Sequence, residues 1–313
     1  MIVDLTDVTT STVAKEMNRL RESGGVVALG RVLTLVISTR PEYVEKALTA
    51  ANLASREHPC RIIVLAAGAA QAPTRLDAQI RVGGDAGASD VVILQGQGAN
   101  ATESESLIGA LLLPDAPIVV WWPHDAPEVP AASPLGRIAH RRITDSAAGP
   151  HARSALMALR TSYRAGDTDL AWTRLTGWRI QLAAIFDHLN ANEIRSVTVE
   201  GAVDSPSTIL LAAWLTQCLH VPVTMARSKA GQGMRAVRFS RIGGDVVLSR
   251  MAGDVASLYQ QGHPVQRIAL ARRTDQDCLA EELRRLDPDE VFGDVVQNGL
   301  ALTDLKEVAP SER

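Results

Sequence analysis

The chain has 313 residues, enough for two domains of roughly 150 residues each. Hydrophobic residues make up 46% and charged residues 21%, which indicates a globular protein, and the net charge of −3 offers no basic surface for nucleic acid or anionic membranes. Apolar runs such as Val32–Ile37 are far shorter than the roughly 18 residues of a membrane span, and the acidic start Met1–Asp7 predicts no signal peptide.

The first half of the chain alternates predicted strands with predicted helices. Thr10–Ser23 has apolar residues on one stripe and predicts a helix ended by Gly24 and Gly25. Continuous apolar runs then predict strands that are buried on both faces, at residues 32–37, 61–65, 90–94 and 117–122. This alternation predicts a Rossmann-like open, mostly parallel α/β sheet in an N-terminal domain of residues 1–165.

Two capping boxes predict where helices begin in that domain. Thr39 with Glu42, and Thr102 with Glu105, each have the spacing in which a hydroxyl and a carboxylate satisfy the first amides of a helix. The second box predicts a helix that continues to Leu112.

The second half, residues 166–313, predicts a C-terminal α/β domain opened by a long helix. An apolar stripe that runs from Ala171 to Leu189 at helical spacing predicts that helix, and Ser205 with Pro206 predicts the start of another. Alternating runs at 235–240 and 245–250, joined through Gly243 and Gly244, predict an antiparallel hairpin. A charged helix is predicted at residues 277–286.

One glycine-rich turn offers a candidate nucleotide site. Gly96, Gly98 and Ala101 match G-x-G-x-x-[GA] between a predicted strand and a predicted helix, the context in which backbone amides receive a pyrophosphate. Glu103 and Glu105 place negative charge nearby, and a tight turn without ligand explains the same glycines. The three residues are therefore the candidate cofactor-binding residues of an alternative function, a Rossmann-type nucleotide- or sugar-phosphate-binding protein or enzyme.

Other chemical motifs are missing from the sequence. The seven histidines form no HxH or HExxH pattern, and no G-x-S-x-G segment occurs. Cys60, Cys218 and Cys278 lie far apart with no zinc spacing, which favours a reducing cytoplasm. The sequence therefore predicts no catalytic residues, no metal and no cofactor.

The tryptophans are concentrated in two short segments. Trp121-Trp122-Pro123-His124-Asp125 follows a predicted strand, at the edge where open α/β sheets bind ligands. Trp178 falls on the apolar stripe of the long helix, whereas Trp172 and Arg179 share its flank. Tryptophan and arginine are enriched in interfaces, although a seam inside the chain explains the pair equally well. The candidate partner-binding residues are Trp121, Trp122, His124, Asp125, Trp172, Arg174 and Arg179.

The same segments resemble a known family. Residues 112–123 resemble the LLLPDLPV-x-LWW stretch of the glucose-6-phosphate dehydrogenase assembly protein family, OpcA, and residues 169–179 resemble its D-L-x-W-x-R-L-T-x-W-R segment. Residues 142–146 and 205–215 also fit, in the same order. The resemblance implies a cytoplasmic, non-catalytic assembly factor and allosteric activator that forms a hetero-oligomer with the dehydrogenase of the oxidative pentose phosphate pathway. Some members carry redox-active N-terminal cysteines, but here Cys60 has no second cysteine near it in sequence.

Overall fold

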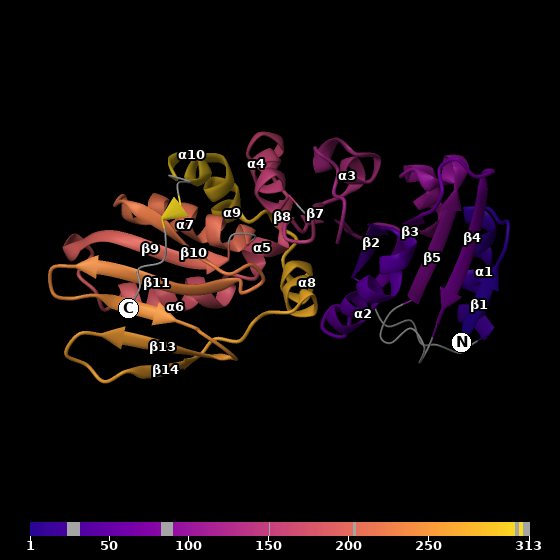
Figure 1. Ribbon diagram of the computed structural model, residues 1–313. Helices are drawn as coiled ribbons and strands as arrows, with labels where there is room; N and C mark the ends of the chain where they lie inside the picture. Colours follow the sequence, from indigo (N-terminus) through magenta and orange to yellow (C-terminus); the bar gives the residue numbers. More distant parts are fainter. Residues whose placement is uncertain (24–31, 83–89, 150, 203–204, 304–306, 309–313) are drawn as a thin grey trace. The chain divides into compact units, whose positions relative to one another are not determined.

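A computed structural model describes residues 1–23, 32–82, 90–149, 151–202, 205–303 and 307–308 of the protein (Figure 1). The predicted helix end at Gly24 and Gly25 lies outside these residues. The chain forms two units that interleave along the sequence. Unit 1 comprises Met1–Asp145, Arg164–Thr168 and Asp275–Pro288; unit 2 comprises Ser146–Tyr163, Asp169–Thr274 and Asp289–Arg313. The break placed between residues 165 and 166 from the sequence falls inside the short segment Arg164–Thr168 of unit 1.

Unit 1 is built on an eight-stranded sheet in the order β1-β4-β5-β3-β2-β6-β7-β8. The five strands from β5 to β7 pair in parallel. Four of them, β2, β3, β5 and β6, were predicted from continuous apolar runs, because strands covered on both faces need apolar side chains on both. The sequence did not predict β7 and β8, nor β1 and β4, which add antiparallel pairing at one edge. The strands are β1 Ile2–Leu5, β2 Leu33–Thr39, β3 Cys60–Ala67, β4 Arg75–Arg81, β5 Asp90–Gln97, β6 Ile118–Trp121, β7 Arg141–Thr144 and β8 Asp167–Asp169.

Helices from both ends of the chain complete unit 1. Helix α1 (Thr10–Ser23) has the predicted bounds, and its buried Val13, Met17 and Leu20 belong to one core cluster with side chains of the sheet. Helix α2 (Val44–Ala54) packs against α8 (Asp275–Arg284). The remaining helical segments are α3 Pro134–Ile138 and the 3-10 helices Pro41–Tyr43, Gly98–Ala101, Glu105–Leu107, Gly109–Leu111 and Pro130–Ala132.

Both predicted capping boxes are wrong. Thr39 ends β2, and the 3-10 helix that follows has Arg40 at its N-cap, a side chain that offers no acceptor oxygen to the first amides. In place of a helix through Leu112, short 3-10 helices follow Gly98. Ser104 rather than Thr102 is the cap, since its hydroxyl accepts a hydrogen bond from the amide of Ser106.

Unit 2 contains a seven-stranded sheet in the order β14-β13-β12-β11-β9-β10-β15. Strands β9, β10 and β15 are parallel, and the others form an antiparallel meander (Figure 1). The predicted hairpin is confirmed as β11 and β12, with Gly244 at φ +96° in its turn. The strands are β9 Ile194–Ala202, β10 Val223–Ser228, β11 Met234–Arg241, β12 Val246–Ser249, β13 Val255–Gln260, β14 Gln266–Ala269 and β15 Glu307–Val308.

The predicted long helix of unit 2 is two helices that share one apolar stripe. Helix α5 (Leu170–Thr173) is capped by Asp169, and α6 (Thr176–Phe186) follows after a break at Arg174 and Leu175. The stripe residues from Ala171 to Ile185 are buried, so the periodicity predicted the buried face although the helix is interrupted. The other helices are α4 Ala152–Ser162, α7 Pro206–Leu219, α9 Glu290–Asp294, α10 Leu300–Leu302, the 3-10 helix Ala191–Glu193 and the π-helix Val295–Gly299. Among the described residues, no helix combines the length and apolar character needed to cross a membrane.

Candidate functional site

The parallel sheet of unit 1 has its topological switch point between β2 and β6. From β2 the chain proceeds to β3 and β5 on one side, and β6 then pairs on the other side. In open α/β sheets, ligands bind beyond the carboxyl ends of the strands at such a point. The predicted residues His124 and Asp125 lie just beyond the end of β6, so the fold places them at this crevice.

Four side chains of unit 1 contact one another at the switch point. The rings of His124 and Tyr43 are 4.1 Å apart, and Arg40 Nε lies 2.8 Å from Asp125 Oδ2. The guanidinium of Arg40 also lies 5.0 Å from the centre of the Tyr43 ring. Burial lowers the pKa of His124 below its ordinary value, and the positive charge of Lys46 acts in the same direction. The imidazole is therefore a packed, neutral group at neutral pH, and Asp125 remains exposed.

The two tryptophans before this edge are core residues. Trp121, the last residue of β6, is 2% exposed, and Trp122, which follows it, is 1% exposed. The Trp122 indole donates a hydrogen bond to Glu103 Oε1 at 2.7 Å. Both tryptophans hold the strand end in place, and neither presents surface to another molecule.

The glycine-rich turn is closed by hydrogen bonds within unit 1. The amide of Gly98 donates to the carbonyl of Ala69 at 3.0 Å, and the amide of Ala99 donates to the Thr74 hydroxyl at 3.1 Å. A Cβ on Gly96 would lie 1.9 Å from the Asn100 carbonyl oxygen, which accounts for the glycine by packing alone. The turn leads into the 3-10 helix Gly98–Ala101 rather than an α-helix, and the adjoining cavity measures only about 10 Å³.

The turn also follows a different strand from the one that nucleotide binding uses. In a Rossmann fold the phosphate-binding glycines follow the first strand, next to the switch point. Here β2 is in that place and is followed by Arg40 and Pro41, whereas the Gly96 turn follows β5. The amides that a pyrophosphate would need are thus used within the chain or replaced by proline.

In unit 2, Trp172 and Arg179 stack as the sequence predicted. The guanidinium carbon of Arg179 lies 3.9 Å from the centre of the Trp172 ring, and the indole donates to Asp289 Oδ2 at 2.9 Å. The Trp172 ring also lies 5.9 Å from that of Phe292. Trp172 is only 1% exposed, so the expectation of a tryptophan accessible on the helix flank is wrong: α9 covers it. Arg179 and Arg174 remain partly accessible.

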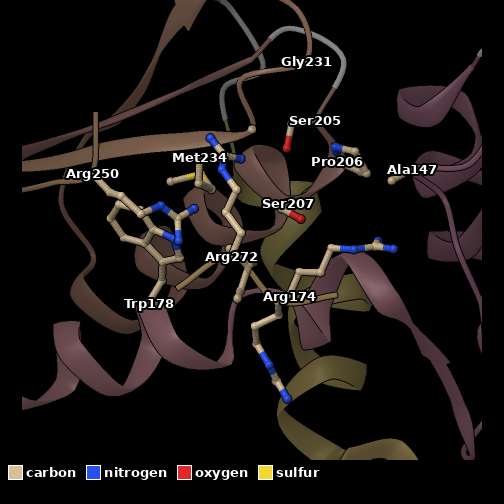
Figure 2. A pocket seen from close by; sticks show the side chains of 13 residues that line it. Ala147, Arg174, Trp178, Ser205, Pro206, Ser207, Gly231, Met234, Arg250 and Arg272 are labelled. Atoms are coloured by element: carbon tan, nitrogen blue, oxygen red, sulfur yellow. The ribbon is translucent and has the colours of Figure 1, made fainter. Parts of the chain in front are cut away.

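Unit 2 also contains a cavity of about 240 Å³ with four arginines in its wall, which we call the arginine pocket. Arg174 comes from the end of α5, Arg250 follows β12, and Arg272 and Arg273 follow β14. Figure 2 shows Arg174, Arg250 and Arg272 near the start of α7, where Ser205, Pro206 and Ser207 also line the pocket. Of the four, only Arg174 was a candidate from the sequence, because the others are scattered along the chain and only the Arg272-Arg273 pair is visible as a basic run.

Arg250 is the buried cation of the pocket. It is 5% exposed, its Nη1 donates to the carbonyls of Leu270 and Ala271, and its guanidinium carbon lies 5.3 Å from the Trp178 ring centre. Its Nε has no hydrogen-bond partner among the described residues. Burial lowers the pKa of Arg250 and repulsion from Arg272 lowers it further, while the negative charge of Asp254 acts in the opposite direction. No aspartate or glutamate is among the described residues that line the pocket, so its wall is strongly positive.

Comparison with known proteins identifies the family in both units. Residues 51–161 match the model of the N-terminal domain of the glucose-6-phosphate dehydrogenase subunit, and residues 165–296 match the model of its C-terminal domain. The chain belongs to the OpcA family. The resemblance found in the tryptophan segments is thereby confirmed, since Trp121 and Trp122 fall in the first match and Trp172 falls in the second. No curated protein matches the sequence significantly.

Solved structures match this OpcA-family chain only at low sequence identity. A 3-ketoreductase from Actinomadura kijaniata with NADP is 11% identical with a TM-score of 0.49, over 89% of this chain and 100% of that one. A glucose-6-phosphate 1-dehydrogenase from Mycobacterium avium is 10% identical with a TM-score of 0.47, over 89% and 94%. An oxidoreductase from Sinorhizobium meliloti is 9% identical with a TM-score of 0.48, over 86% and 95%. Likeness at this level does not extend to function.

Proposed function

We propose that the chain is a non-catalytic assembly factor and allosteric activator of glucose-6-phosphate dehydrogenase, with which it forms a hetero-oligomer in the cytoplasm. The observation that carries the proposal is the match of both halves of the chain to domains of a subunit of that enzyme. Because the matches extend through both sheets, the proposed role belongs to the whole chain and not to one module.

The contents of the switch-point crevice support a role without catalysis. A dehydrogenase holds a dinucleotide on glycine amides beside the first strand. Here Arg40 and Pro41 occupy that turn, and the adjoining space is packed with Tyr43 and His124. These contacts stabilise the carboxyl ends of the strands, and they favour a structural or partner-binding role for this edge of the sheet over a catalytic one.

We place partner contacts at the accessible residues of the two tryptophan segments. In unit 2 these are Arg174 and Arg179, and in unit 1 they are His124 and Asp125. Arginine is enriched in interfaces because its guanidinium covers apolar area and keeps several donors. The buried Trp172 acts as the platform that fixes Arg179, since the guanidinium stacks on its ring.

Co-purification with the dehydrogenase from the same cell tests the proposal. The two proteins should elute together, and the chain alone should transfer no hydride from glucose 6-phosphate to either nicotinamide cofactor. Arg179→Ala should weaken the association about tenfold or more, with a reduced salt dependence. The matched control is Arg195→Ala, which removes an exposed arginine of β9 and should leave the affinity unchanged. Separate elution, or turnover by the chain alone, contradicts the proposal.

A further inference from the structure

The arginine pocket concentrates more positive charge than the fold requires. Its wall carries Arg174, Arg250, Arg272 and Arg273, without a carboxylate among its described lining residues. Guanidinium groups repel one another, and their repulsion grows where the surroundings exclude water. Gathering these cations around one cavity costs stability, and an anion in that cavity would lower this cost.

Arg250 bears most of this cost because it is buried. With 5% of its surface exposed, it has lost nearly all its hydration, and its Nη1 donates to two backbone carbonyls rather than to a carboxylate. Within the described part of the chain its Nε donates to nothing. The negative charge of Asp254 attracts the guanidinium and offsets part of this loss. A buried cation whose hydrogen bonds go only to carbonyls is still expensive, and such groups concentrate at functional sites. An anion in the pocket would accept from this guanidinium directly.

The start of α7 faces the same cavity. This helix is 14 residues long, and Ser205 at its N-cap makes no side-chain capping bond. Pro206 at its first position has no amide to donate, so the helix contributes its dipole rather than an amide of that residue. The N-terminus of a helix carries partial positive charge, and it favours anions, phosphate above all. Gly233 also lines the cavity at φ +62°, where a Cβ would lie 2.9 Å from Arg272 Nη1, so the backbone leaves room for that guanidinium.

We infer that the arginine pocket binds a small phosphate-bearing anion, a phosphomonoester or free phosphate. A phosphate dianion presents several oxygens to guanidinium forks and offsets two positive charges, whereas a single carboxylate offsets one. The cavity of about 240 Å³ lies below the roughly 300–1,000 Å³ of pockets for drug-sized ligands, which fits a small ester and excludes a dinucleotide. The inference concerns this chain alone and does not depend on its partnership with a dehydrogenase.

Calorimetric titration of the purified full chain tests the inference at constant ionic strength. Inorganic phosphate, glycerol 3-phosphate and acetate are the three probes, since the first two separate free phosphate from an ester and the third supplies a carboxylate. Phosphate or its ester should bind saturably, and acetate should not. Arg272→Ala should weaken binding about tenfold or more, because one charge-assisted set of hydrogen bonds is lost.

Arg267→Ala is the matched control for that variant. Arg267 lies in β14 and is exposed like Arg272, but it is not part of the pocket wall. Its removal takes away the same charge and should leave the phosphate affinity within about twofold of the wild-type value. Both exposed arginines can be replaced without disturbing the core. No heat with either phosphate probe, equal binding of acetate, or an equal loss in both variants would overturn the inference.

Discussion

Replacement of Trp172 by alanine should destabilise unit 2 strongly. The indole is 1% exposed, packs against Phe292 and donates to Asp289. Truncation of a buried tryptophan to alanine costs about 3–5 kcal/mol through lost burial and the cavity left behind. Asp289 also accepts from the amide of Phe292 at the start of α9, so the loss extends to the helix that covers the ring.

Urea unfolding of two further variants separates the contributions. Trp172→Phe fills most of the volume but leaves Asp289 without the indole donor, which should cost about 1–3 kcal/mol. Arg179→Ala removes the stacked cation together with its hydrogen bond to the Thr176 hydroxyl, and should cost about 0.5–2 kcal/mol. The slope of the unfolding transition should stay the same in all three, since the surface exposed on unfolding hardly changes.

The refuting result is a Trp172→Ala protein within about 1 kcal/mol of the wild type, which is far below the loss expected for a buried indole. If that protein also failed to bind the dehydrogenase, Trp172 would be an accessible interface anchor, as its sequence position first suggested. Loss of stability with normal activation by the folded fraction supports the buried platform.

Three other perturbations test unit 1. Gly98→Ala should lower the free energy of unfolding by about 1–3 kcal/mol, because φ is +60° and the new Cβ would lie 2.7 Å from backbone atoms. Gly109→Ala, which has open space around the new Cβ, should leave it unchanged. Thermal unfolding measures both variants. Glu282→Gln should lower the free energy of unfolding in urea by about 3–5 kcal/mol, because it removes the carboxylate that pairs with the buried Arg141. Glu57→Gln breaks an exposed pair and should change it by less than about 1 kcal/mol. Since the pKa of His124 is lowered in the fold, the unfolded chain takes up the proton first as pH falls through about 6.5. Stability should therefore decline toward acid pH, and His124→Gln should remove part of that decline.

Local sequence patterns were sufficient to predict many of the helices and strands. The four apolar runs of the parallel sheet, α1 and the β11–β12 hairpin follow from periodicity and turn residues, because each is decided by neighbours within a few positions. The capping boxes failed for the same reason. A hydroxyl and a carboxylate at the right spacing do not show that Arg40 or Ser104 will lie at the N-cap of the next turn.

Contacts between distant parts of the chain could not be predicted from the sequence. Helix α8 was predicted as a helix, but nothing in its sequence shows that it packs on α2, or that its Glu282 pairs with Arg141. The burial of Trp172 depends on Asp289 and Phe292, more than a hundred positions later. The arginine pocket likewise gathers residues from separate loops, so its charge is invisible until the chain has folded.

A titration of dehydrogenase with this chain tests the proposed function most directly, with activity and molecular mass recorded on the same samples. Activity should rise and saturate at the ratio at which light scattering shows a hetero-oligomer, and the chain alone should stay inactive. Activity that never changes while the masses of the two proteins remain separate would contradict it.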